Sequence, residues 1–189
     1  MIGLCFSGSP RLRLGDIGFR VDSRRNRRSV AIPLPDASNR VIEAARRLGL
    51  DLTIHHFPDG TKTSADAAAA VGCELSAIAK SIVFMADERP VVAILPGDRR
   101  LDPVKLAKAV GAEKARRASL DEARRATGFA AGGTPAFGYP APIPVYLDQG
   151  LEIHEQVWSA AGTPTTVYPI ALADLIRASR ARVADLAER

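Results

Sequence analysis

The stretch "AKSIVFMADERPVVAILPGD", residues 79–98, decides the fold. It holds two apolar runs rich in valine and isoleucine, separated by charged residues and a proline over positions 88–90. β-Branched and aromatic side chains are enriched in strands, and the charged, proline-containing break is typical of a turn. The stretch therefore predicts a β-hairpin of two apolar strands.

Two helices are predicted before the hairpin. Apolar residues recur at helical spacing after Ser38, which is a good N-cap, and Gly49 is expected to end this helix. The alanine-rich segment "TSADAAAAVG", residues 63–72, predicts a short helix capped by Thr63 or Ser64.

Two more capped helices are predicted after the hairpin. The first has Asp102 as its cap and Pro103 in its first turn, where the missing N–H costs nothing. The second begins with Ser119 and Glu122, at the spacing of a capping box, and ends at Gly128.

Strands are predicted over residues 52–57, over 143–147 and near 165–168, with a final helix over 172–179. Another helical turn is expected close to the C-terminus. Because hairpins and helices alternate without a repeating βαβ unit, the sequence predicts an α+β fold and not a doubly wound one. We expect a mixed β-sheet flanked by helices.

Length and charge suggest one domain with a basic extension. The net charge of +5 is carried by residues 1–35, which hold seven arginines against two aspartates. The rest of the chain is neutral, with 19 basic and 19 acidic residues, so any contact with nucleic acid by the body has to be local. We therefore expect a flexible extension over residues 1–37, either a solvated or mis-assigned leader or a contact to nucleic-acid phosphates, and a single domain over 38–189.

Cellular location is inferred from what the sequence lacks. No apolar run approaches the roughly 20 residues that span a bilayer, and the first residues do not read as a secretory signal. Two cysteines, Cys5 and Cys73, are too few for a disulfide framework. These features favour a cytoplasmic protein with no membrane association.

Lys80 is the first candidate for chemistry, because it interrupts an apolar run where a helix gives way to a strand. In a strand of period two, Lys80 shares its face with Ile82 and Phe84, and not with Ser81 and Val83. An ammonium group on an apolar face must extend to solvent, pair, or bind an anionic ligand. The residues alone leave these alternatives open.

The glycine-rich segment "TGFAAGGTPAFG", residues 127–138, is the second candidate. Gly132 and Gly133 form a bulge, or they allow backbone N–H groups to approach a phosphate or an oxyanion. Asp148 ends a strand, and its carboxylate is suited to accept a proton, bind an amino group, or cap a turn. Gly162 lies in a second glycine-containing loop.

Metal and triad chemistry are not indicated. His55 and His56 are adjacent on a predicted strand and point to opposite faces, and His154 has no ligand spacing around it. No Ser–His–Asp set or Walker loop is present, so no cofactor and no metal are expected.

Together these segments resemble the YbaK / prolyl-tRNA-synthetase-associated editing-domain family. The matching segments occur in order: "LTIHHF", "VGCELSAIAKSIVF" with the family's lysine at Lys80, "VVAILPGDRRLDPVKLAKAVGAEKARRAS", "ATGFAAGGTPAFG", "PVYLD" and "AAGTPTTVYPIALADLI". The resemblance covers residues 38 to the C-terminus and implies a partly barrel-like sheet. It also implies hydrolysis of the ester of mischarged aminoacyl-tRNA, with the 3′ acceptor end of tRNA as partner and an aminoacyl-tRNA synthetase as a second partner.

Carried over by position, the resemblance makes Lys80, Gly132 and Gly133 the catalytic residues, with Lys80 on the terminal adenosine phosphate or the ester carbonyl. It implies that the substrate-binding residues are Phe57, Ser81, Thr134, Pro135, Asp148 and Gly162. Two departures concern specificity. Several relatives have proline in place of Ala136, and bacterial Cys-tRNA deacylases often have tyrosine where this chain has Phe57.

The resemblance implies a free-standing editing enzyme that acts on tRNA-Pro carrying a smaller amino acid, such as alanine or cysteine. Such an enzyme is useful because a synthetase pocket discriminates by only about 1–3 kcal/mol per methylene. The alternatives are a deacylase specific for Cys-tRNA, a non-catalytic module that binds tRNA or a synthetase, and a hydrolase of another small acyl ester. The sequence does not indicate an oligomeric state.

Overall fold

The computed structural model describes residues 33–58, 60, 61 and 63–188 of the chain. The described residues belong to one compact unit that starts at Pro33. Most of the predicted basic extension over residues 1–37 lies outside them, so that boundary stays a prediction.

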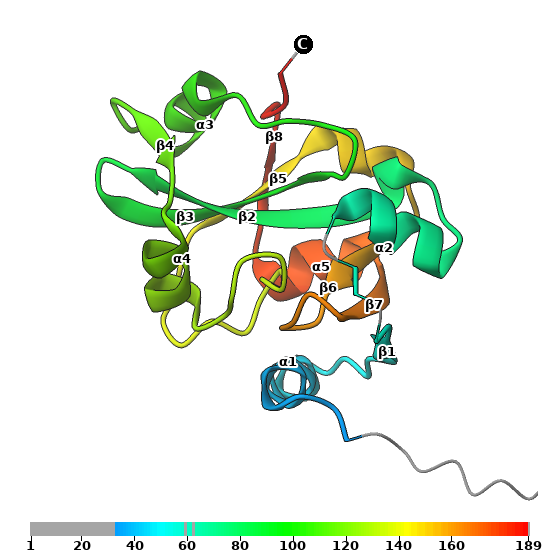
Figure 1. Cartoon of the computed structure of the whole chain (residues 1–189). Helices are drawn as coiled ribbons and strands as arrows, with labels where there is room; N and C mark the ends of the chain where they lie inside the picture. Colours follow the sequence, from blue (N-terminus) through cyan, green and yellow to red (C-terminus); the bar gives the residue numbers. More distant parts are fainter. Residues whose placement is uncertain (1–32, 59, 62, 189) are drawn as a thin grey trace, which may run out of the picture. The chain divides into compact units, whose positions relative to one another are not determined.

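The part of the chain that the structure describes is built on one eight-stranded mixed sheet (Figure 1). Its strand order is β1-β7-β6-β2-β3-β5-β8, with β4 paired to β2 beside this path. The β2–β3, β6–β7, β1–β7 and β2–β4 pairs are antiparallel, whereas β2–β6, β3–β5 and β5–β8 are parallel. The prediction of an α+β fold with a mixed sheet is confirmed. The strands are β1 (His55–His56), β2 (Ile78–Ala86), β3 (Arg89–Pro96), β4 (Ala115–Arg117), β5 (Val145–Asp148), β6 (Gln156–Ala160), β7 (Thr166–Ala171) and β8 (Arg182–Ala184).

The predicted hairpin forms the centre of the sheet. Strands β2 and β3 pair along their whole length, from Ala79 opposite Pro96 to Ala86 opposite Arg89. The turn between them is Asp87–Glu88, one residue earlier than expected, and both residues have positive φ, 44° and 63°. Turns of this kind match the right-handed twist of the strands that they join.

Within the described residues, five α-helices and two 3-10 turns pack around the sheet. Three of the α-helices begin as predicted, with capping boxes at Thr63 and Ser119 and an aspartate cap at Asp102. The last helix covers the predicted residues. The elements are α1 (Asp36–Arg47), α2 (Ser64–Val71), η1 (Leu75–Ala77), α3 (Pro103–Val110), α4 (Leu120–Thr127), η2 (Gln149–Ile153) and α5 (Leu172–Ser179).

Three local predictions are wrong. Ser38 does not cap α1, which begins at Asp36; Ser38 is fully buried inside it, with its Oγ 3.0 Å from Oγ1 of Thr166. The strand expected over residues 52–57 is reduced to β1, because only two residues pair with β7. The expected C-terminal helical turn is strand β8, which pairs with β5.

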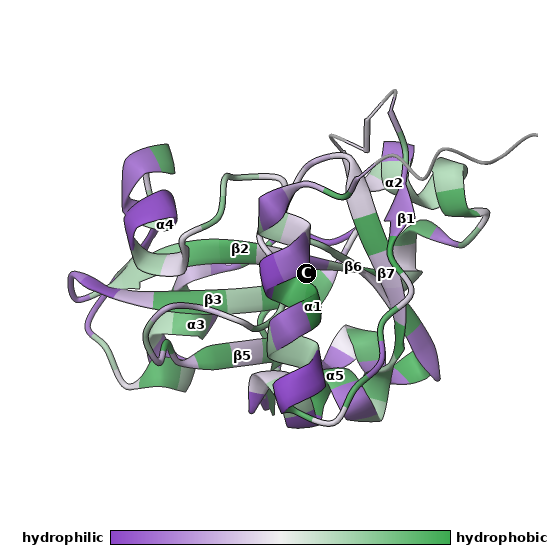
Figure 2. Ribbon diagram, turned by 90° about the horizontal axis from the view of Figure 1, so that it is seen from below, coloured by the Kyte–Doolittle hydropathy of each residue, from purple (hydrophilic) through white to green (hydrophobic). Residues whose placement is uncertain are grey.

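The two faces of the hairpin bury different cores. On β2, Ala79 and Val83 pack into a cluster with Phe129, Tyr168 and other residues of β5–β7, α1, α4 and α5. Phe84 and Ala86 point to the other side, into a cluster with Leu106 of α3. Figure 1 shows α3 on one side of β2 and β3 and α1, α4 and α5 on the other, and Figure 2 shows that much of β2 and β3 is hydrophobic. The hairpin is therefore apolar on both faces.

Candidate active site

A cavity of about 440 Å³ lies on the face of β2 that carries Ser81 and Val83. Its walls come from α2, β2, β6, the start of α4 and the loop at residues 131–134. These elements are far apart in the sequence, and the sheet order β6-β2 brings two of them side by side.

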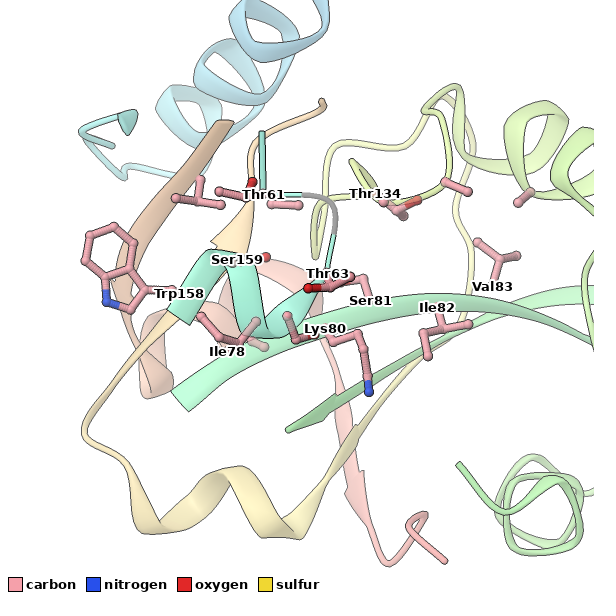
Figure 3. Close-up of a pocket in the computed structure, with 18 of the residues that line it drawn as sticks. Thr61, Thr63, Ile78, Lys80, Ser81, Ile82, Val83, Thr134, Trp158 and Ser159 are labelled. Atoms are coloured by element: carbon pink, nitrogen blue, oxygen red, sulfur yellow. The ribbon is translucent and has the colours of Figure 1, made fainter. Parts of the chain in front are cut away.

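The cavity is lined mainly by hydroxyl groups and small apolar side chains. Thr61, Thr63, Ser81, Thr134 and Ser159 contribute hydroxyls around one space, as Figure 3 shows. Within the described part of the chain, no aspartate or glutamate lines it, and its charged residues are lysine and arginine. The site is therefore suited to a neutral or anionic ligand that offers hydrogen bonds.

Two of these hydroxyls have no hydrogen-bond partner. Oγ of Ser81 and Oγ of Ser159 are both buried, and neither meets a partner among the described residues. Ser159 is only 1% exposed. Tyr168 lies beside Ser159 in the β6–β7 register, and its buried phenol likewise has no well-aligned hydrogen-bond partner in the part of the chain that the structure covers. Burial raises the pKa of Tyr168, a rise that the adjacent Ser159 hydroxyl opposes. Buried hydroxyls are nearly always hydrogen-bonded, so this wall is prepared for a ligand or water.

Lys80 lies in the cavity wall, but its ammonium group points to the other side of β2 (Figure 3). The predicted alternation holds, because Lys80 shares its face with Ile82 and Phe84. Its Nζ donates to the carbonyl oxygens of Arg99, at 2.7 Å, and Gly97, at 3.3 Å. Partial burial lowers the pKa of Lys80, and the negative charge of Asp98 opposes this shift. Lys80 thus ties β2 to the loop that follows β3.

The glycine pair splits into two roles. Gly132, with a φ of 82°, lines the cavity. Gly133 is buried and packs against the loop that contains Gly162: a Cβ on Gly133 would lie 2.6 Å from Cα of Thr163. A Cβ on Gly162 would in turn lie 2.7 Å from the backbone of Ala37. The bare backbone of Gly133 and Gly162 is therefore required for close packing between two loops and the start of α1.

Asp148 lies outside this cavity. It is 1% exposed, and its carboxylate accepts three backbone N–H groups: Gly150 at 2.9 Å, Leu186 at 2.8 Å and Ala187 at 3.0 Å. The last two belong to the C-terminal segment after β8. Of the roles that the sequence left open, the contacts support that of a cap, since the carboxylate holds this segment against β5.

Of the other predicted substrate-binding residues, some line the cavity and some do not. Thr134 is buried and lines the cavity, as does Ser81. Phe57 and Pro135 are not among its lining residues; the backbone of Phe57 pairs with Thr165, and the carbonyl of Pro135 accepts the hydroxyl of Tyr139. The structure thus brings Ser81, Gly132 and Thr134 together and leaves Phe57 and Pro135 outside.

Sequence reasoning missed Ser159, Arg117 and the two threonines before α2. Ser159 lies on β6, a strand that was not predicted, and a serine in "QVWSA" carries no signal of its own. Arg117 lies on β4, which the sequence did not distinguish from the loop around it. In the portion of the chain covered by the structure, no three histidine, cysteine or acidic residues gather as a metal site would require.

A family model described as the aminoacyl-tRNA editing domain matches residues 58–178. The chain belongs to this family. All the residues that line the cavity fall within the matched region of the editing domain. The resemblance stated from the sequence is thereby confirmed.

Named relatives are consistent with this membership. The Enterococcus faecalis protein "Putative Cys-tRNA(Pro)/Cys-tRNA(Cys) deacylase EbsC" is 33% identical over 96 residues, 50% of this chain and 58% of that protein. The proline–tRNA ligase of Geobacter sp. strain M21 is 32% identical over 112 residues, 59% of this chain and 20% of the ligase. The aligned part of this chain therefore spans little more than half of the first relative and a fifth of the second.

A solved structure shares the fold. The crystal structure of "a putative trans-editing enzyme for prolyl tRNA synthetase" superposes with a TM-score of 0.79 and 37% identity, over 83% of this chain and all of that one. Among the described residues, no helix has both the length and the apolar character needed to cross a membrane.

Proposed function

We propose that this editing domain is a trans-acting deacylase that hydrolyses the ester of mischarged tRNA-Pro carrying a smaller amino acid, such as alanine or cysteine. The observation that carries the proposal is the hydroxyl-lined cavity within the matched family region. A volume of about 440 Å³ suits a small acyl group and part of the terminal nucleoside.

The cavity suits an ester that reacts with water once it is positioned. None of its described lining residues is a histidine or a carboxylate, so a Ser–His–Asp mechanism is not supported. An aminoacyl ester is labile, and positioning together with electrostatic stabilisation supplies several kcal/mol without an enzyme nucleophile.

Backbone groups of the glycine loop are suited to stabilise the oxyanion. The N–H of Gly133 donates to Ala130, whereas the N–H groups of Gly132 and Thr134 have no acceptor among the described residues. Both residues line the cavity. We propose that these two N–H groups stabilise the negative charge that develops on the carbonyl oxygen of the ester.

The charged residues have separate roles. Arg116 is paired with Glu88 and Glu122, each at 2.8 Å, whereas the neighbouring Arg117 lines the cavity edge and is available for a phosphate of the acceptor end. Lys80 acts as a positioning residue, because its ammonium group holds the loop at Gly97 and Arg99. Direct contact of Lys80 with the substrate requires that it first leave these two carbonyls.

The test is a deacylation panel with Ala-, Cys-, Ser- and Pro-tRNA-Pro. We expect the wild-type protein to hydrolyse at least one mischarged species well above the buffer rate and to spare Pro-tRNA-Pro. Lys80→Ala is expected to lower kcat/KM about tenfold or more, and Lys105→Ala, which removes a lysine bound to Asp185 away from the cavity, serves as control. Wild-type rates equal to buffer for every mischarged tRNA would refute the proposal.

The name of the Enterococcus relative favours one variant of this function, a Cys-tRNA-specific deacylase. It predicts that cysteine is released much faster than alanine in the same panel. Unaltered tRNA binding by wild type and Lys80→Ala without turnover by either would instead indicate a non-catalytic module, and turnover of a free ester without tRNA would indicate a general esterase. We propose with this function that the protein acts in the cytoplasm and has a synthetase as a second partner.

A further inference from the structure

The unpaired hydroxyls of Ser81 and Ser159 lie on adjacent strands and face the same space. Ser159 pairs with Ala79 in the β2–β6 register, and Ser81 lies two residues further along β2 on the same face. From strand spacing and rise, their Cα atoms are about 8 Å apart. Both residues line the same cavity.

Apart from the phenol of Tyr168, which lies beside Ser159 in the β6–β7 register, this wall offers the two hydroxyls no polar side chain from the described residues. Their other neighbours on the same face are Ala79 and Val83 of β2 and Val157 of β6, which belong to the apolar core. Water can occupy a cavity of this size in the free protein. A ligand that displaces this water must replace its hydrogen bonds or lose affinity.

We propose that Ser81 and Ser159 are specificity-determining residues that hydrogen-bond a hydroxyl or thiol on the β-carbon of the acyl group. This inference rests on the proposed function and narrows its substrate to seryl or cysteinyl esters in preference to alanyl esters. An alanyl methyl group offers no hydrogen bond to either hydroxyl. A site built to hydrogen-bond a substrate discriminates strongly against the analogue that lacks the group.

The same pair helps to spare the cognate ester. Beyond its α-nitrogen and Cα, the proline ring carries only methylene groups, so its side chain offers no hydrogen bond to Ser81 or Ser159. The polar wall therefore disfavours a prolyl group in addition to the limited size of the cavity, and this selection requires no carboxylate.

The experiment measures kcat/KM for Ser-, Cys- and Ala-tRNA-Pro with wild type, Ser81→Ala and Ser159→Ala. Ser179→Ala is the matched control, because Ser179 is also buried but its Oγ donates to Leu175 outside the cavity. We expect wild type to prefer Ser- or Cys-tRNA-Pro over Ala-tRNA-Pro by about tenfold or more. Each cavity variant should lose most of this preference through slower Ser and Cys release, whereas Ser179→Ala should keep it.

Several outcomes overturn the inference. One is a wild type that hydrolyses Ala-tRNA-Pro as fast as the other two, and another is a preference that survives in both cavity variants. An equal loss for all three esters would mean that the hydroxyls bind a group common to every aminoacyl ester, such as the α-amino group. Each of these outcomes leaves the proposed deacylase function intact. A wild-type protein that is inactive on all mischarged tRNAs would refute both the proposed function and this inference. Comparison of the rates for Ser-tRNA-Pro and Cys-tRNA-Pro shows whether the two serines bind a hydroxyl or a thiol better.

Discussion

Replacing Gly133 with alanine tests how the cavity loop is held in place. A Cβ at this position would lie 2.6 Å from Cα and 2.7 Å from N of Thr163, and 2.8 Å from the carbonyl carbon of Gly162. All three are backbone atoms, so no side chain can rotate to relieve the contact. One of the two loops has to move, by several tenths of an ångström or more.

The expected cost follows from this geometry. Overpacking a tight contact costs about 1–3 kcal/mol, and a clash with backbone alone belongs at the upper end, about 3 kcal/mol. For a domain of this size, a loss of 1 kcal/mol lowers Tm by about 2–4 °C, so Gly133→Ala should lower Tm by about 9 °C. The same movement displaces Gly132 and Thr134. It should therefore lower kcat/KM for ester hydrolysis even at temperatures well below Tm, where the variant is still folded.

Gly111→Ala separates a clash from backbone strain. Gly111 ends α3 with a φ of 74°, and a Cβ there would meet nothing within 4 Å. Alanine at this position should lower the free energy of unfolding only by the strain of a left-handed backbone, about 1–2 kcal/mol. Thermal and urea unfolding of the two variants measure both costs. If Gly133→Ala is no less stable than Gly111→Ala, close packing between the two loops is not what requires glycine at position 133.

Two further predictions concern residues away from the cavity. Asp148→Asn should destabilise the domain by about 2 kcal/mol in urea unfolding, because one carboxylate oxygen that accepts Gly150, Leu186 or Ala187 becomes an NH₂ donor. Its kcat/KM at low temperature should stay near wild type, and a selective loss of activity would instead indicate a role for Asp148 at the substrate. For Glu122, hydrogen bonds from Arg116 and then from the N–H of Ser119 lower its pKa from 4.5 to about 2. A carboxyl with a depressed pKa stabilises the fold above its unfolded pKa, so the stability advantage of wild type over Glu122→Gln should be complete near neutral pH and vanish between about pH 4.5 and pH 2. An advantage that persists unchanged at pH 2 would contradict this.

Lys80 shows how a correct local prediction can leave a role open. The period-two pattern placed it on the face of Ile82 and Phe84, and the structure agrees. That same face is turned away from Ser81, Gly132 and Thr134. Sequence spacing could not reveal this, because the cavity is defined by elements that pack on the other side of β2.

The glycines show a similar limit. Their number in the segment over residues 127–138 left two alternatives open, a bulge or a close approach of bare backbone to a ligand group. For Gly133 the close neighbour is the loop of Gly162 and Thr163, and a sequence pattern does not tell which backbone lies opposite. Of the pair, only Gly132 reaches the cavity.

The sequence by itself determined the hairpin, the capped helices α2, α3 and α4, the last helix and the family. These depend on local chemistry: cap hydroxyls, glycines after helices, and runs of β-branched residues. The tertiary structure alone decided that Ser81 and Ser159 share one wall, that Asp148 holds the C-terminal segment, and that residues 182–184 extend as β8 instead of turning as a helix. The reason is that each of these depends on hydrogen bonds between strands or on packing between residues tens of positions apart, and such contacts have no period in the sequence.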